Sequence, residues 1–123
     1  MTLEESIKYH ASTTPKKIAV VCGTEQISYS HLWESIIRRS QELNDNGLQP
    51  HRPYVYRATQ DIDFIVTYCA VHHLKAIAVP LEHQAPEERF QSISQEVESQ
   101  IFADDIVDIL YTTGTTGKAK GVM

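Results

Sequence analysis

Two patterns of hydrophobic residues alternate along the chain, one typical of helices and the other typical of strands. Apolar residues recur every three or four positions in the expected helices and form short continuous runs in the expected strands. The helices are expected over residues 3–10, 31–45, 62–74 and 86–97. The strands are expected over residues 18–22, 26–29, 54–57, 76–80 and 106–112.

Capping residues and turn residues mark the ends of these elements. Thr2 and Glu5 form a capping box for the first helix, while Ser30 and Asp61 are expected to cap the second and third helices. Gly23 lies in the short loop between the first two strands, which predicts a β-hairpin. The chain therefore enters its sheet through an antiparallel pair.

The second and third helices differ in how their apolar residues are distributed. The second has one apolar stripe, made of Leu32, Ile36, Ile37 and Leu43. Its other face is expected to stay in solvent and carries Arg38, Arg39, Gln41 and Glu42. The third helix is apolar on all sides, so we expect it to lie between two layers of the structure.

The order of the elements indicates an α/β fold. Strands that alternate with helices of this length are typical of βαβ units, in which the strands run parallel. With 123 residues, the chain is long enough for one small domain. We therefore expect a β-hairpin leading into βαβ units with a mostly parallel sheet.

Composition and charge narrow the classes of function. The chain is 41% hydrophobic and 22% charged, which is ordinary for a folded domain and excludes disorder. Its net charge of −5 provides no general attraction for nucleic acid or for an anionic membrane. We find neither the pattern of a signal peptide nor an apolar run that could span a bilayer. A cytoplasmic location is therefore expected.

The residue types that most often bind metals do not form a metal-binding pattern. Cys22 and Cys69 are isolated in apolar surroundings, without CxxC spacing, and are expected to be buried free thiols. The six histidines are scattered, and the adjacent His72 and His73 would point in different directions on a helix. An acidic cluster between residues 82 and 108 is expected to be a solvated surface.

Glycine, threonine and lysine are concentrated at residues 111–123, with the sequence YTTGTTGKAKGVM, which holds three of the five glycines and no acidic residue. Glycines let a ligand approach backbone N–H groups closely, while hydroxyl and ammonium groups bind phosphate oxygens. The spacing differs from that of a Walker A loop, which needs four residues between its glycines and a hydroxyl after its lysine. Composition alone leaves open a flexible hairpin or chain end.

This segment resembles the signature loop of the AMP-forming acyl-CoA synthetases and of the wider adenylate-forming superfamily. The family pattern reads approximately Y/F-T-S/T-G-S/T-T-G-x-P-K-G-V, and the chain departs from it at Ala119, where proline is usual. Residues 15–34 and 74–90 resemble the family's opening hairpin and its next strand and helix, although Lys75 replaces a common glycine. The passage from residue 90 to residue 111 is short, because many relatives carry an additional strand and helix there.

The resemblance implies an ATP-dependent ligase. In that family a carboxylate, here expected to be that of a fatty acid, attacks the α-phosphate of Mg-ATP, and the resulting acyl-AMP passes its acyl group to coenzyme A. ATP with Mg²⁺, the carboxylic acid and coenzyme A would then be the partners. The β- and γ-phosphates would be held by Thr112, Thr113, Gly114, Thr115, Thr116, Gly117 and Lys120. No catalytic residue and no metal ligand is assigned within the chain.

Length limits what the resemblance implies for this chain alone. Members of the family are several times longer, and their adenine and carboxylate pockets and catalytic lysine follow the loop. We therefore interpret residues 1–123 as one partial domain, the N-terminal portion of an AMP-binding domain, with little activity of its own. The alternative is a catalytically inactive α/β module that binds a partner or self-associates through an exposed sheet edge. The acid and its chain length stay open.

Overall fold

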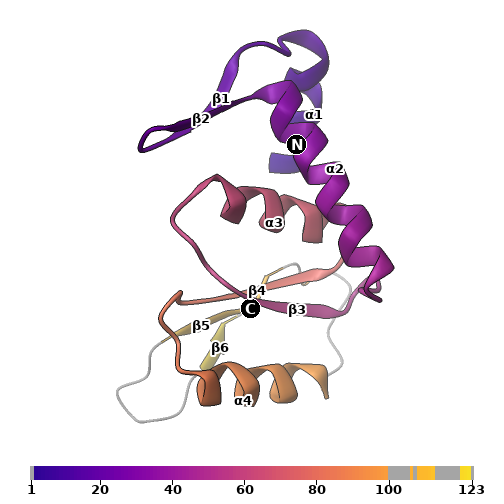
Figure 1. The fold of residues 1–123 in the computed structure, drawn as a ribbon. Helices are drawn as coiled ribbons and strands as arrows, with labels where there is room; N and C mark the ends of the chain where they lie inside the picture. The colour runs from indigo at the N-terminus through magenta and orange to yellow at the C-terminus, as the bar shows by residue number, and fades with distance from the viewer. Residues whose placement is uncertain (1, 100–105, 107, 113–119, 123) are drawn as a thin grey trace.

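The computed structural model describes residues 2–99, 106, 108–112 and 120–122. Its helices are α1 (Leu3–Thr13), α2 (Tyr29–Asp45), α3 (Ile62–His73) and α4 (Glu87–Glu98). Its strands are β1 (Ile18–Cys22), β2 (Glu25–Ser28), β3 (Pro53–Arg57), β4 (Ile77–Leu81), β5 (Leu110–Thr112) and β6 (Lys120–Val122). In Figure 1, α3 and α4 cover opposite faces of the β3–β4 pair, α2 runs alongside α3, and α1 and the β1–β2 hairpin lie beyond α3. The predicted α/β class is confirmed.

The second helix begins two residues earlier than expected. Its cap is Ser28 and not Ser30, and the Ser28 hydroxyl accepts a hydrogen bond from the backbone N–H of His31. The N–H groups of Tyr29 and Ser30 donate to carbonyl groups that precede β1. Because the neighbouring chain satisfies these donors, β2 passes directly into α2. The first helix also runs further than expected, to Thr13.

The first two strands form the predicted antiparallel hairpin. Val20 lies opposite Ile27, and Cys22 lies opposite Glu25. Gly23 has a φ of +61°, a left-handed conformation that glycine adopts without steric strain. The turn between the strands is therefore formed at Gly23, as the sequence indicates.

The parallel part of the fold is built on β3 and β4, which α3 connects. The two strands pair in register from Pro53 opposite Ile77 to Arg57 opposite Leu81. The last strand expected from the sequence, residues 106–112, is shorter in the structure. Among the described residues, β5 pairs with β6 in an antiparallel ladder, and its approach meets β4 in an isolated parallel bridge between Ala78 and Asp108.

Pro80 explains why this bridge does not extend into a ladder. The backbone of Ile77 faces β3, whereas the carbonyl of Ala78 accepts from Ile109 on the opposite edge of β4. Backbone groups of successive strand residues face alternate neighbours, so residue 80 faces the same edge as residue 78. Proline has no N–H to donate at that position, and the next bond to β5 cannot form.

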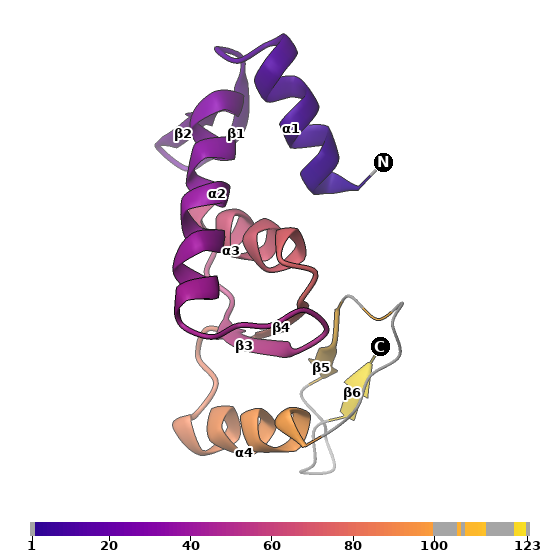
Figure 2. The ribbon, with the colours of Figure 1, turned by 90° about the vertical axis from the view of Figure 1, so that its right-hand side faces the viewer.

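The connection through α4 has the less common hand. The β3–α3–β4 connection is right-handed, as almost all such crossovers are. β5 is displaced from β4 in the same direction as β4 is from β3, yet α4 lies on the opposite face from α3 (Figures 1 and 2). The β4–α4–β5 connection is therefore left-handed. A right-handed connection through α4 would place the next strand beside the outer edge of β3.

The apolar core has two parts, one on each face of the β3–β4 pair. The larger part joins α1, α2 and α3 to the sheet and includes the fully buried Ile36 and Val71. The smaller part lies between β4 and α4 and includes Ile93 and Val97 on the inward face of that helix. The position of α3 between two layers confirms the prediction from its apolar composition. Within the described residues, no helix combines the length and apolarity that a bilayer span requires.

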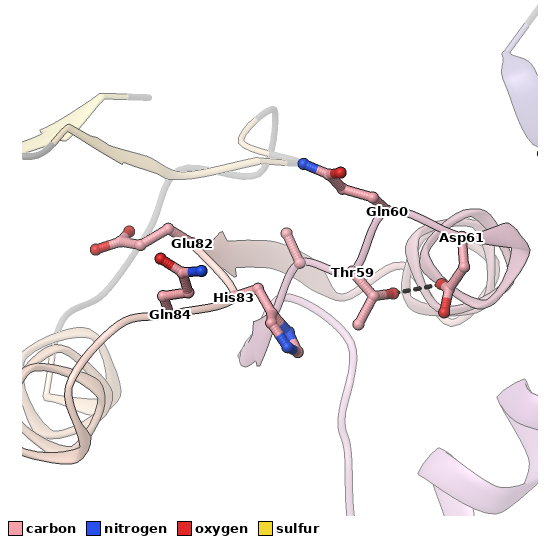
Figure 3. A pocket seen from close by; sticks show the side chains of 7 residues that line it. Thr59, Gln60, Asp61, Glu82, His83 and Gln84 are labelled. Carbon is pink, nitrogen blue, oxygen red and sulfur yellow. Dashed lines mark hydrogen bonds between the residues drawn. The ribbon is translucent and has the colours of Figure 1, made fainter.

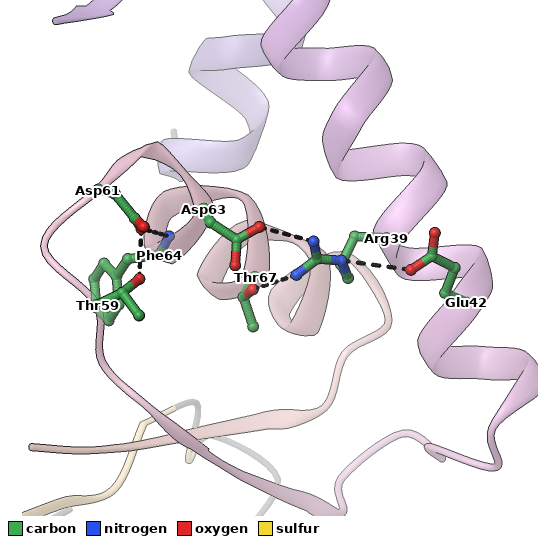
Figure 4. A network of polar contacts seen from close by, with 7 residues as sticks. All are labelled: Arg39, Glu42, Thr59, Asp61, Asp63, Phe64 and Thr67. Carbon is green, nitrogen blue, oxygen red and sulfur yellow. Dashed lines mark hydrogen bonds and ion pairs between the residues drawn. The ribbon is translucent and has the colours of Figure 1, made fainter. Parts of the chain in front are cut away.

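Arg39 contradicts the expectation that the polar face of α2 is solvated throughout. Its guanidinium donates to the carboxylate of Asp63 at 2.8 Å and to the hydroxyl of Thr67 at 2.7 Å, both on α3 (Figure 4). It also lies 3.6 Å from the carboxylate of Glu42 on its own helix. Position 39 borders the apolar stripe, so the packing of α2 on α3 carries its side chain to the edge of the contact. The neighbouring Arg38 is exposed, as expected.

Candidate functional site

The carboxyl ends of the parallel strands form an open pocket of about 710 Å³. Residues 58–61, which follow β3, and residues 82–84, which follow β4, line it (Figure 3). Ligands of open α/β sheets bind at this edge, beyond the carboxyl ends of the strands. Because the approach to β5 is parallel to β4 at Asp108, β5 also ends toward this edge, directly before residue 113.

One wall of the pocket is the start of α3. Asp61 caps the helix, as predicted, because its carboxylate accepts from the backbone N–H of Phe64 at 3.2 Å. The hydroxyl of Thr59 donates to the same carboxylate oxygen. Gln60, which follows β3, and His83, which follows β4, also line the pocket (Figure 3). Amide and imidazole groups can both donate and accept hydrogen bonds, so this wall suits a polar ligand.

Arg57, the last residue of β3, holds the opposite wall in place. Its guanidinium donates to the backbone carbonyl of Ala85 and to the carboxylate of Glu87 at 3.1 Å. It also lies over the ring of Phe90, 4.8 Å from the ring centre. These contacts tie the end of β3 to the loop between β4 and α4. The hydrogen bonds from Gln91 and from Arg57 lower the pKa of the Glu87 carboxyl.

Ion pairs divide the acidic cluster that the sequence places between residues 82 and 108. Glu82 pairs with Arg89 at 2.8 Å, and Glu87 pairs with Arg57. Asp108 pairs with a histidine of α3. The expectation of a solvated surface therefore holds for Glu87 and Glu88, which are exposed, but only in part for Glu82 and Asp108, which are half-buried. Asp104 and Asp105 lie outside the described residues.

The loop residues assigned from the sequence lie at and beyond the β5–β6 hairpin. Thr112 ends β5, Lys120 begins β6, and the two are directly opposite each other in the ladder. The structure therefore brings the two ends of the loop together. Thr113, Gly114, Thr115, Thr116 and Gly117 lie outside the described residues. The phosphate-binding role of all seven residues stays a prediction.

The cysteines and histidines are engaged separately in the structure. Cys69 is buried as predicted, and burial raises the pKa of its thiol to about 11. Cys22 is only half-buried, contrary to expectation, because it ends an edge strand; its thiol donates to the carbonyl of Gln60 at 3.1 Å. His72 and His73 contact different carboxylates. Among the described residues, no three histidine, cysteine or acidic residues gather into a metal site.

Sequence reasoning missed the residues that line the pocket. Thr59, Gln60, His83 and Gln84 belong to no chemical motif. The available signal was positional, because each of these polar residues follows closely after an apolar strand of a predicted βαβ unit. Such positions converge at one edge of a parallel sheet.

A comparison with protein families decides where this fold belongs. The family model described as AMP-binding enzyme matches residues 7–103, most of the chain. The chain belongs to the AMP-binding enzyme family. Its resemblance to adenylate-forming enzymes, inferred from the loop and the upstream segments, is thereby confirmed.

Curated relatives of the chain include very long peptide synthases. Tyrocidine synthase 3 of Brevibacillus parabrevis is 25% identical over 159 residues, which cover 99% of this chain and 2% of that protein. Gramicidin S synthase 2 of Brevibacillus brevis is 22% identical over 159 residues, 99% of this chain and 4% of the relative. The chain thus spans a small fraction of either relative.

Solved structures share the fold at low sequence identity. The inhibitor-bound N-terminal domain of FACL13 from Mycobacterium tuberculosis has a TM-score of 0.77 and 17% identity, over 97% of this chain and 43% of that one. The N-terminal subdomain of Klebsiella oxytoca NpsA has a TM-score of 0.74 and 18% identity, over 98% and 41%. O-Succinylbenzoate CoA synthetase of Bacillus subtilis, in complex with its acyl-adenylate intermediate, has a TM-score of 0.72 and 18% identity, over 94% and 40%. The chain spans less than half of each.

The alignments also show that this chain lacks residues that its relatives have. The alignment with tyrocidine synthase 3 extends over 159 positions, whereas the chain has 123 residues, so at least 36 positions have no counterpart here. The passage between residues 90 and 111 was expected to be shorter than in many relatives, so the missing positions are in keeping with that expectation. This passage lies in the left-handed connection between α4 and β5.

Proposed function

We propose that the protein that contains this chain activates a carboxylic acid with ATP and that residues 112–120 hold the phosphates. The observation that carries the proposal is the position of β5. It ends toward the carboxyl edge of the parallel strands and leads directly into a loop of threonine, glycine and lysine. Membership of the AMP-binding enzyme family supports ATP as a substrate.

The chemistry of the loop fits the departure of pyrophosphate. When a carboxylate attacks the α-phosphate of ATP, negative charge accumulates on the β- and γ-phosphates. Hydroxyl and backbone N–H donors together with the ammonium group of Lys120 would stabilise that charge more in the transition state than in the ground state. Mg²⁺ would arrive with ATP as part of the substrate complex, and we assign it no ligand in this chain.

Coenzyme A is our first choice of acyl acceptor, with a fatty acid as the substrate. The overall similarity to acyl-CoA synthetases supports this choice, and o-succinylbenzoate CoA synthetase shares the fold. A second candidate is the activation of an amino acid for a peptide synthase. The matches to tyrocidine synthase 3 and gramicidin S synthase 2 favour that candidate. The two candidate functions differ in the acid that is activated and in the thiol that receives it.

The domain proposal follows from the same comparison. Residues 1–123 would form one partial domain, the N-terminal subdomain of a longer cytoplasmic ligase, whose further segments would supply the adenine and acid pockets. The shares of 40–43% of the solved chains are in keeping with this division. The alternative is a module without catalytic activity that acts through self-association or a partner.

Pyrophosphate binding by the chain itself tests the phosphate-loop proposal. We expect calorimetric titration to show weak binding that decreases as salt is added, because charge neutralisation drives it. Lys120→Ala should weaken binding about tenfold, as expected when one charged hydrogen bond is lost. Lys16→Ala removes an equal charge at an exposed residue remote in sequence and should leave binding unchanged. Equal affinities for Lys120→Ala and the wild type would contradict the proposal.

A further inference from the structure

Three side chains join α3 to the approach of β5. The hydroxyl of Tyr68 donates to one carboxylate oxygen of Asp108 at 2.8 Å. The Nε2 atom of His72 lies 2.8 Å from the other carboxylate oxygen. The side chains of His72 and Asp108 are 23% and 32% exposed, so both hydrogen bonds are partly shielded from water. We call Tyr68, His72 and Asp108 the α3 clamp.

The helix presents its two members of the clamp in a fixed arrangement. Tyr68 and His72 are four residues apart, which places them on one face of α3. Their rings meet edge to face with centres 4.3 Å apart, and Phe64 continues the row at 6.1 Å from Tyr68. Burial raises the pKa of Tyr68 to about 12, and its hydrogen bond to Asp108 adds to the shift. The hydroxyl therefore remains a donor at neutral pH.

The strand that the clamp holds has little other support from the sheet. Beyond the bridge between Ala78 and Asp108, Pro80 lacks the N–H that would extend the ladder between β4 and β5. Ile109 is buried at 2% exposure and fixes one side of the chain. Asp108 fixes the other side through its carboxylate. These two residues immediately precede the three residues of β5.

We propose that Asp108 is a positioning residue for the phosphate loop, acting through β5. The inference rests on the proposed function of residues 112–120. The hydrogen bonds of the Asp108 carboxylate with Tyr68 and His72 fix the position at which β5 leaves the sheet. The position of β5 in turn fixes where the loop begins at the carboxyl edge. Loss of these hydrogen bonds allows the β5–β6 hairpin to move as a unit and lowers the fraction of molecules in which the loop is aligned with its ligand.

Two measurements on the same variants test the clamp. Hydrogen exchange of the Ile109 amide, which donates to the carbonyl of Ala78, reports how firmly the approach of β5 is held against β4, and titration with pyrophosphate reports the alignment of the loop. Asp108→Ala should speed the exchange and weaken pyrophosphate binding, each about tenfold, as loss of a charged hydrogen bond predicts. Asp108→Asn keeps an oxygen acceptor for Tyr68 and should recover part of both effects. Glu88→Ala removes an exposed carboxylate and should change neither.

The outcomes separate the clamp from the proposed function. If Asp108→Ala leaves exchange unchanged, or speeds exchange without weakening pyrophosphate binding, the positioning role is wrong while the phosphate loop stands. If Lys120→Ala weakens binding without changing exchange and Asp108→Ala changes both, the two proposals are supported together. If the wild type does not bind pyrophosphate, the phosphate loop is wrong and the positioning role is overturned with it. Exchange alone then shows whether Asp108 holds β5.

Discussion

At the scale of single residues, Arg39 shows how neighbouring positions on one helix acquire different roles. Arg38 and Arg39 are residues of the same type, and both lie outside the apolar stripe of α2. The hydrogen bond with Asp63 raises the pKa of Arg39, and its second bond reaches Thr67, a polar residue buried at 7% exposure. Thr67 therefore depends on Arg39, because a buried hydroxyl without a partner carries a desolvation cost.

We predict that Arg39→Ala lowers the free energy of unfolding by about 1–2 kcal/mol, since it removes charge-assisted hydrogen bonds at a partly exposed position. The matched control is Arg38→Ala, which should change stability by less than about 0.5 kcal/mol. Urea unfolding followed by circular dichroism measures both. Equal losses for the two variants would show that the bonds in Figure 4 contribute nothing to stability.

At the scale of elements, α3 is the helix on which the arrangement of the site depends. Its first residue follows the Asp61 cap at the pocket edge, and its last turn carries His72 of the clamp. The cap and the two-sided apolarity of this helix were both predictable from the sequence, because they depend on residues a few positions apart. The length of the last strand was not, because Pro80 weakens it from a neighbouring strand.

The cap of α3 gives a prediction for the element as a whole. Asp61→Ala should lower the free energy of unfolding by about 1 kcal/mol, because the N–H of Phe64 loses its acceptor at the start of the helix. Asp61→Asn should cost only a few tenths of that, since asparagine caps about as well as aspartate. Thermal and urea unfolding of the two variants make the comparison. A loss in Asp61→Asn as large as in Asp61→Ala would mean that the charge, not the cap, stabilises α3.

At the scale of the whole molecule, the outer edge of β3 is unpaired among the described residues. The left-handed connection through α4 bypasses it, and at least 36 aligned positions of a relative have no counterpart in this chain. Unpaired edges attract other strands, which supports the proposal of self-association.

Val55 offers a test of the outer edge with a matched control, which is needed because its side chain also packs against the smaller part of the core. Arg52 and Ala58 face β4 through their backbone groups, so residue 55 faces outward by the alternation along the strand. Val55→Pro removes one outward N–H and keeps the ladder with β4. Val55→Ala is the control, because it also changes the side chain but retains the N–H.

We expect sedimentation velocity to show concentration-dependent association of the wild type and of Val55→Ala, and a reduced association of Val55→Pro. The physical reason is that a strand added at the edge needs the outward N–H groups of β3 as donors. A wild type that stays monomeric at all concentrations, or a Val55→Pro variant that associates as the wild type does, would contradict self-association through this edge.

The sequence by itself determined the α/β class, the hairpin, the Asp61 cap and the family to which the chain belongs. Each of these depends on residue types at short separations, where periodicity and backbone preferences act without distant contacts. Only the tertiary structure decided the partners of Arg39, the α3 clamp at Asp108, the pocket at the strand ends and the hand of the α4 connection. These depend on which distant segments meet, and hydrogen bonds between such segments leave no period in the sequence.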